Sequence, residues 1–333
     1  MTHPPVKAED HLSGGVELEY RQLKIVIAVV GPTCVGKTDT GVELAKLIDG
    51  EVISADSRQI HRLIDIGTAK PTPEQRRMVP HHLVDIVPLE ETISAGGYAA
   101  LARSAILEIF DRGKTPIVVG GSGLYLRALI DGLFLAPEVD PEIRLTLRQR
   151  LAVEGREKLL EELKRVDPGA ADGLVPGNFK RVLRGLEVFY SSGKRISDLR
   201  KELPDPPDFT TIQFGITMER KVLYRRIEAR TDDMIEAGLV EEVRAILGRG
   251  IDPSLNSLQT TGYMETIKYL RGEIKFEEMV ALIKMNTRRY AKRQMTWFRK
   301  DSRIIWIEAT GKSPVEVAEE IRRAIMEKNQ AIR

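Results

Sequence analysis

Eight residues near the start of the chain have the types and spacing of a phosphate-binding loop, the pattern G-x-x-x-x-G-K-[ST]. They are Gly31, Pro32, Thr33, Cys34, Val35, Gly36, Lys37 and Thr38. In such a loop the backbone N–H groups converge on phosphate oxygens, and the N-terminus of the following helix adds partial positive charge. Lys37 supplies a full charge, and the hydroxyl of Thr38 can hold Mg²⁺. The pattern predicts that the chain binds a phosphate group without saying which one.

The sequence on either side of the loop fits this prediction. Residues 25–30 are apolar and mostly β-branched, as in a buried strand, and apolar residues at helical spacing follow the loop. Residues 51–54 are predicted to form a second strand, and Asp56 lies just beyond it. Ligands bind at this edge of an open α/β sheet, so Asp56 could act in chemistry. Asp-Ser pairs also commonly cap turns and helices, and position alone leaves both roles open.

Strand and helix patterns alternate through the first half of the chain. We expect a strand at residues 83–87, a helix at 94–111, and at 117–125 a strand that runs into a Gly-rich turn and a helix. This alternation favours the α/β class, with a P-loop-type core in which a parallel sheet is flanked by helices. The adjacent pair His81 and His82 shares no strand or helix face, and no zinc site is expected there.

The chain is predicted to divide into three parts. Residues 1–22 look like a polar, flexible N-terminal extension. Residues 23–139 and 202–333 form the P-loop α/β core with its C-terminal helices, and residues 140–201 form an all-helical insertion domain. The insertion is highly charged and lacks strong strand signals, whereas a strand pattern resumes at residues 210–217. This return favours an insertion over a separate terminal domain.

A long helix is expected at residues 275–300, and its last part is strongly basic. Seven Lys and Arg residues and no acid lie between residues 284 and 300. Tyr290, Trp297 and Phe298 are interleaved with them. Such a run suits contact with a nucleic-acid backbone, but it also suits a solvated helix face whose aromatic residues pack in the core.

Composition limits the remaining possibilities. The 333 residues carry a net charge of only +2, so a nucleic-acid surface must be a local patch. Cys34 is the one cysteine, which rules out an intrachain disulfide and fits a reducing compartment. No apolar run reaches 18 residues, so no membrane span is expected. We therefore expect a cytoplasmic protein that does not contact membranes.

Several stretches resemble one enzyme family, the tRNA dimethylallyltransferases, also called tRNA isopentenyltransferases. They span nearly the whole chain and occur in the order of that family. The stretches are GPTCVGKT (31–38), ISADSRQIH (53–61), DIGTAKP (65–71), VGGSGLYLRAL (119–129), RVLRGLEVFYSSGK (181–194), TTGYMETIKYL (260–270) and TRRYAKRQMTWFR (287–299). The pair DSRQIH and DIGTAKP is not a general nucleotide-binding signal, which makes the resemblance specific.

The resemblance implies a reaction and its substrates. The phosphate loop, residues 31–38, would hold the diphosphate of dimethylallyl diphosphate, with Mg²⁺ as cofactor. The dimethylallyl group would go to the exocyclic N6 of the adenine 3′-adjacent to the anticodon, giving N6-isopentenyladenosine and diphosphate. The core and the insertion would hold the anticodon stem–loop of the tRNA. A monomer is expected.

The resemblance also assigns roles to residues. Asp56 would take the N6 proton, and Arg230 would add positive charge at the leaving oxygen. Thr33 would act with Lys37 and Thr38 on the diphosphate. Ser122 stands where the family usually has Thr and would position a substrate. The residues expected to contact tRNA are Asp56, Ser57, Arg58, Gln59, Ser122, Arg144, Lys180, Arg181, Val182, Leu183, Arg184, Gln259, Thr260, Thr261, Gly262, Tyr263 and Met264, the last of which replaces a more usual basic residue.

Three other functions remain open on the sequence. A P-loop kinase or NTPase would need an acid at the end of an apolar strand, and Asp85 is a partial candidate. A noncatalytic RNA-binding protein would leave Lys37 and Thr38 without a purpose. Isopentenyl transfer to free adenine nucleotides would not need the helical insertion or the basic helix.

Overall fold

The structure is a computed structural model that describes residues 24–133, 137, 139–202 and 207–332, with side chains up to residue 328. The predicted extension at residues 1–22 lies outside this range. The chain folds into two compact units. Among the described residues, one comprises 24–130 and 207–332, and the other comprises 131–133, 137 and 139–202. No helix among the described residues is long and apolar enough to cross a membrane.

A six-stranded sheet forms the centre of the first unit, and every neighbouring pair of strands in it is parallel. Its order is β3-β2-β4-β1-β5-β6. The strands are β1 (Ile25–Val30), β2 (Gly50–Ser54), β3 (His81–His82), β4 (Thr115–Gly120), β5 (Thr210–Thr217) and β6 (Ile305–Glu308). The predicted α/β class with a parallel sheet flanked by helices is confirmed.

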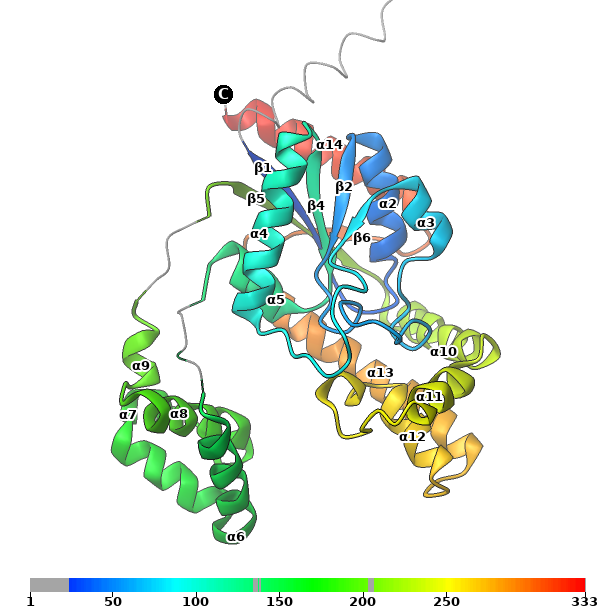
Figure 1. Ribbon diagram of the computed structural model, residues 1–333. Helices are drawn as coiled ribbons and strands as arrows, with labels where there is room; N and C mark the ends of the chain where they lie inside the picture. The colour runs from blue at the N-terminus through cyan, green and yellow to red at the C-terminus, as the bar shows by residue number, and fades with distance from the viewer. Residues whose placement is uncertain (1–23, 134–136, 138, 203–206, 333) are drawn as a thin grey trace, which may run out of the picture. The chain divides into compact units, whose positions relative to one another are not determined.

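Helices cover both faces of this sheet (Figure 1). Alternate residues of β1 point to opposite sides, so Ile27 packs in the layer of α2 (Lys37–Leu47) and α14 (Pro314–Ile332). Ala28 packs in the layer of α4 (Ala95–Asp111) and α5 (Gly123–Ile130). Burial on both faces explains why β1 is a continuous apolar run.

The strand order places the phosphate loop at a crossing point of the topology. The chain passes from β1 through α2 to β2 on one side, and it enters β5 on the other side after β4. At such a point the connections leave a crevice at the carboxyl ends of the strands, where ligands of open α/β sheets bind. The loop that follows β1 opens into this crevice.

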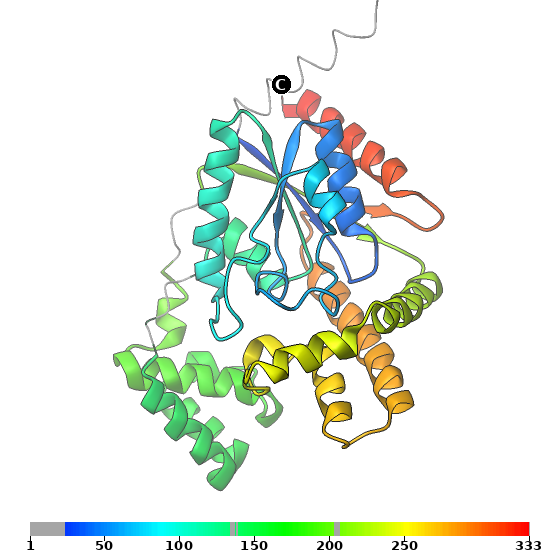
Figure 2. The ribbon, with the colours of Figure 1, turned by 45° about the vertical axis from the view of Figure 1, so that its right-hand side comes forward.

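A group of helices gathers at one end of the sheet (Figure 2). They share an apolar core that includes Leu239, Tyr263 and Ile283, and this core also takes Ile64 from the loop after β2. The helices are α10 (Arg220–Glu236), α11 (Leu239–Gly248), α12 (Tyr263–Leu270) and α13 (Phe276–Phe298), with the short turn η2 (Asn256–Leu258). The helix predicted at 275–300 is α13.

The second unit is entirely helical and contains the residues predicted as an insertion, 140–201. It has its own apolar core, in which Leu159, Leu163 and Leu186 are fully buried. Its elements are α6 (Pro141–Val166), with a break at Gly155, α7 (Pro168–Ala171), η1 (Pro176–Asn178), α8 (Phe179–Ser192) and α9 (Ile196–Leu199).

One predicted strand is wrong. Residues 83–87 form no strand, and the edge strand β3 is only the two residues before them. Leu83 and Asp85 both have φ of 60°, which interrupts an extended backbone. Val87 keeps a single bridge to His61. The short helix α3 (Pro73–Met78) precedes this region and begins with a capping box at Thr72.

Candidate active site

The phosphate loop curls between β1 and α2 because several of its residues have positive φ. Gly31 has φ of 147°, and a Cβ there would lie 2.6 Å from the carbonyl oxygen of Ile216, so glycine is required. Lys37 Nζ donates a hydrogen bond to the carbonyl of Pro32 at 2.7 Å. Burial lowers the pKa of Lys37 to about 8, although the nearby Asp56 carboxylate opposes this shift. The loop thus holds its cation ready for a phosphate group.

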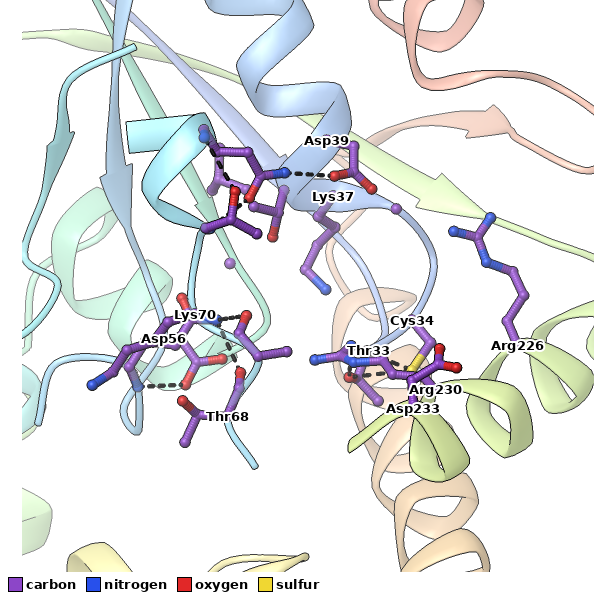
Figure 3. A pocket seen from close by; sticks show the side chains of 18 of the residues that line it. Thr33, Cys34, Lys37, Asp39, Asp56, Thr68, Lys70, Arg226, Arg230 and Asp233 are labelled. Carbon is purple, nitrogen blue, oxygen red and sulfur yellow. Dashed lines mark hydrogen bonds between the residues drawn. The ribbon is translucent and has the colours of Figure 1, made fainter. Parts of the chain in front are cut away.

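Helix α10 brings two guanidinium groups toward this loop (Figure 3). Arg230 Nη1 lies 3.3 Å from Thr33 Oγ1 and 3.3 Å from Cys34 Sγ. Arg226 is one turn earlier on α10 and lines the same cavity. Arg230 and Thr33, each predicted separately to act at the diphosphate, are therefore in contact in the structure.

Asp56 lies just past β2 and combines the two roles that its position left open. Its Oδ1 accepts hydrogen bonds from the backbone N–H groups of Arg58 at 2.8 Å and Gln59 at 3.4 Å, which fixes the turn. Within the described parts of the chain, its Oδ2 accepts no hydrogen bond. One oxygen is structural, and the other is free to meet a ligand.

Two cavities meet at Asp56. The first has a volume of about 480 Å³ and is lined by the phosphate loop, with Lys37 between Asp56 and Arg230 (Figure 3). The second, of about 310 Å³, is lined by residues 259–262 and Met264. Their shared wall consists of Thr33, Cys34, Asp56, Thr68, Arg230 and Tyr290. Two ligands, one in each cavity, would therefore meet beside the same carboxylate and the same guanidinium.

Tyr290 on α13 belongs to this shared wall, and no sequence signal assigned it there. The sequence marked it only as an aromatic residue within a basic run. Burial raises the pKa of its hydroxyl, and the Asp56 carboxylate raises it further. Tyr290 is therefore a neutral aromatic wall rather than a base.

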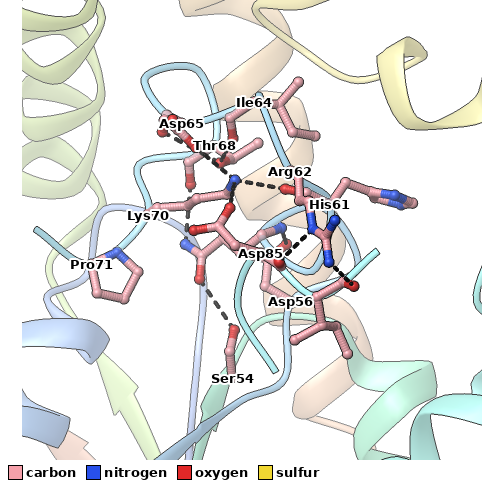
Figure 4. A network of polar contacts seen from close by, with 12 residues as sticks. Ser54, Asp56, His61, Arg62, Ile64, Asp65, Thr68, Lys70, Pro71 and Asp85 are labelled. Carbon is pink, nitrogen blue, oxygen red and sulfur yellow. Dashed lines mark hydrogen bonds and ion pairs between the residues drawn. The ribbon is translucent and has the colours of Figure 1, made fainter. Parts of the chain in front are cut away.

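A buried lysine holds the loop that follows Asp56 (Figure 4). The Lys70 side chain is only 3 % exposed and donates to the carbonyl of His61 and to Asp65, both at 2.6 Å. It also forms an ion pair with Asp85. Although burial opposes ionisation, hydrogen bonds from Lys70 and Arg76 hold the pKa of Asp85 below its usual value. Asp85 is thus engaged in this network and does not line the first cavity, so it is not the acid that a kinase function would need there.

Ser122 lies apart from the wall shared by the first two cavities. Its Oγ accepts a hydrogen bond from the backbone N–H of Ser57 at 2.9 Å. It lines a third cavity of about 400 Å³, together with Arg293 and Trp297. Through this hydrogen bond, Ser122 supports the turn that follows Asp56.

The residues predicted to contact tRNA fall into several environments. Ser57 and Arg58 line the second cavity with residues 259–262 and Met264, whereas Gln59 lines the first. Tyr263 is 0 % exposed, and its hydroxyl donates to Glu242, so its side chain belongs to the helical core. In the insertion, Lys180 and Arg181 are exposed, but Val182 and Leu183 are buried in its core. Arg144 and Arg184 lie 3.5 and 3.6 Å from Glu187.

The basic run of α13 has two kinds of cation. Lys284 and Arg288 form ion pairs with Asp232 and Glu228 of α10, at 2.6 and 2.8 Å. The other five are exposed and have no acidic partner among the residues that the structure describes. They are Arg289, Lys292, Arg293, Arg299 and Lys300. Lys284 and Arg288 are therefore part of the protein's own packing, whereas the five exposed cations are available to contact a nucleic-acid backbone.

Comparison with known proteins identifies the family. A model of the IPP transferase family matches residues 59–301, and a tRNA dimethylallyltransferase of Pelotomaculum thermopropionicum is 46% identical over 301 residues, which are 90% of this chain and 95% of the relative. The chain belongs to the tRNA dimethylallyltransferase family. The resemblance seen in the sequence motifs is confirmed.

Solved structures agree with this family assignment. The crystal structure of the tRNA isopentenylpyrophosphate transferase from Bacillus halodurans is 40% identical, with a TM-score of 0.68, over 92% of this chain and 99% of that one. A eukaryotic dimethylallyltransferase, solved in crystallographic snapshots of its action on tRNA, is 28% identical, with a TM-score of 0.71. That match covers 86% of this chain and 74% of that one. Family and fold are therefore fixed independently of the site geometry.

Proposed function

We propose that the two cavities hold the two substrates of a tRNA dimethylallyl transfer. Dimethylallyl diphosphate occupies the first cavity, with its diphosphate on the phosphate loop. The second receives the adenine 3′-adjacent to the anticodon. The observation that carries this proposal is the shared wall, where Asp56, Thr33 and Arg230 lie between the cavities.

The donor side needs positive charge on the leaving group. As the bond between the allylic carbon and the diphosphate oxygen breaks, the oxygen gains negative charge and the allyl fragment becomes electron-poor. Lys37, Arg226 and Arg230 line this cavity and stabilise the departing diphosphate. The Thr33 hydroxyl, 3.3 Å from the Arg230 guanidinium, is placed to donate a hydrogen bond there.

The residues of the first cavity fit Mg²⁺. The Thr38 hydroxyl and the carboxylates of Asp39 and Asp233 line it, and oxygen ligands are the ones Mg²⁺ prefers. The described residues contain no cluster of three or more His, Cys, Asp or Glu side chains that could hold a metal. A few oxygens suit an ion that keeps several waters and binds largely through substrate phosphates. When bound, Mg²⁺ would neutralise part of the diphosphate charge.

On the acceptor side a proton must leave the amine. Pulling the adenine out of the anticodon loop costs a few kcal/mol, which contacts in the second cavity must offset. The N6 nitrogen then forms a bond to the allylic carbon, and its proton passes to the free oxygen of Asp56. The products are N6-isopentenyladenosine in tRNA and diphosphate.

The insertion and the oligomeric state complete the proposal. The exposed Lys180 and Arg181 on α8 would contact phosphates of the anticodon stem–loop, because exposed cations at such a surface bind the backbone. We also propose that the protein acts as a monomer. Light scattering with and without tRNA measures this directly.

The decisive experiment supplies each candidate acceptor with the same donor. The protein is incubated with dimethylallyl diphosphate and Mg²⁺ together with bulk tRNA, AMP or no acceptor, and nucleosides are analysed by mass. Isopentenyladenosine from tRNA alone is the expected result. Product from AMP would favour transfer to free nucleotides, and ATP hydrolysis without transfer would favour the NTPase function.

A further inference from the structure

We infer that Gln294, on α13, is a positioning residue that fixes the place of Thr33 in the phosphate loop; this inference rests on the function proposed above. The Gln294 amide joins two loops at the carboxyl edge of the sheet. Its Oε1 accepts a hydrogen bond from the backbone N–H of Thr33 at 2.8 Å. Its Nε2 donates to the carbonyl of Gly121 at 3.0 Å. No other hydrogen bond ties α13 to the phosphate loop among the described residues.

The surroundings are shaped for this amide. Gln294 is only 5 % exposed, although glutamine is usually a surface residue. A Cβ at Gly121 would lie 2.1 Å from Gln294 Nε2, so the turn after β4 lacks a side chain where the amide sits. An amide carries a donor and an acceptor at one tip, which matches one N–H group and one carbonyl. Either group left unpaired in this buried place would be unfavourable.

The contact determines what Thr33 can do. Its backbone N–H is taken by Gln294 and is not available to the diphosphate. Its hydroxyl is left to face Arg230 Nη1, 3.3 Å away, on the wall that both cavities share. Gln294 itself borders the first cavity, but both ends of its amide are held by main chain. It therefore acts on the reaction through Thr33.

The first test is Gln294→Met, which keeps the length of the side chain and removes both hydrogen bonds. We expect kcat for tRNA prenylation to fall between 10- and 100-fold, on the order of the loss from about 1 Å of misplacement. The KM for tRNA should stay within about twofold, since Thr33 acts on the donor. The matched control is Gln213→Met on β5, a glutamine that is also 5 % exposed and whose side chain lies near Asp301. The control should lower the melting temperature without changing kcat.

The second test is Gln294→Glu, which makes the contact depend on pH. A carboxylate would accept from Thr33 but would face the Gly121 carbonyl with no proton to donate. A protonated carboxyl group supplies the missing donor and restores both hydrogen bonds. Because burial raises the pKa of a carboxyl group, the kcat ratio of variant to wild type should rise as the pH falls. A ratio that stays flat while both proteins remain folded would overturn the inference.

The third test reaches the same contact from its other side. Gly121→Ala should displace the amide of an unchanged Gln294, since the added methyl group takes its place. Residues that act through one contact give losses that do not add. The double variant Gly121→Ala with Gln294→Met should therefore be no slower than the slower single variant, and multiplied losses would contradict the inference. Wild-type protein that fails to prenylate tRNA would reject the proposed function, whereas active wild type with unimpaired variants would reject only the role of Gln294.

Discussion

Replacing Asp56 with asparagine separates the two roles of that residue. The asparagine carbonyl can still accept from the N–H groups of Arg58 and Gln59, so the turn is kept. The variant lacks the basic oxygen that faces the cavities. Loss of a general base typically slows a reaction 10²–10⁴-fold. That range corresponds to about 2.7–5.5 kcal/mol of activation free energy.

The assay is single-turnover prenylation with saturating tRNA and dimethylallyl diphosphate. Donor affinity is measured by calorimetry on the same samples. The comparison should be made at pH 7, because the Asp56 carboxylate favours the charged form of Lys37. Its removal moves the pKa of Lys37 further down, and at high pH this would weaken donor binding for a reason unrelated to catalysis. At pH 7 the donor affinity should change little.

Asp56→Ala is the informative companion to this variant. It removes the turn contact as well as the base, and loss of such a side-chain cap typically costs about 0.5–2 kcal/mol of stability. The alanine variant should therefore be as slow as the asparagine variant and also less stable. If the asparagine variant keeps nearly the wild-type rate, Asp56 is not the base. If its rate and donor affinity collapse together, Asp56 belongs to the diphosphate or metal site.

The same geometry predicts three further outcomes. Diphosphate affinity measured without Mg²⁺ should fall by up to tenfold per pH unit above about 8, where Lys37 of the free protein loses its proton, and Lys37→Arg should abolish this inflection. The double variant Arg289→Ala with Arg293→Ala should flatten the dependence of log K for tRNA binding on log salt concentration, by about 0.7–0.9 for each phosphate no longer bound. The Arg288 guanidinium is paired to α10, so Arg288→Ala should mainly lower the melting temperature. Tyr290→Phe should retain activity, and Tyr290→Ala should lose about 1–3 kcal/mol of acceptor binding if the ring stacks on a base, as judged from the tRNA KM. Inactive Tyr290→Phe would show that the hydroxyl takes part in the reaction.

The donor half of the site was predictable because its information is local. A phosphate loop needs a strand, eight residues and a helix, and residues 25–47 contain all three in order. The place of Asp56 also followed from the sequence, since residues at the ends of neighbouring parallel strands share one edge of the sheet. The double role of Asp56 did not follow from the sequence. One carboxylate oxygen holds the turn while the other stays free, and a sequence pattern does not distinguish the two oxygens.

The rest of the site depends on contacts between distant segments. Lys70 follows a pattern typical of an exposed loop, yet it is buried and forms ion pairs with Asp65 and Asp85. The same network explains the failed strand at residues 83–87, because Asp85 turns toward Lys70 with positive φ instead of extending an edge strand. Apolar residues made that segment look like a strand, and a tertiary ion pair decided its backbone.

The sequence of helix α13 left one property open, the orientation of the helix about its own axis. Its sequence fixes the period of 3.6 residues but not which side faces the sheet. The contact of Gln294 with Thr33 shows that the side carrying Gln294 faces the phosphate loop. Residues four positions away on the same side then point inward, which places Tyr290 on the cavity wall and Phe298 in the core. The opposite side, at Lys292 among others, must face outward, and it is exposed. Since two of the seven cations are paired to α10, α13 and the two residues after it offer five charges to RNA. A salt slope larger than five contacts allow would require further cations, and the exposed pair on α8 is the next source to test.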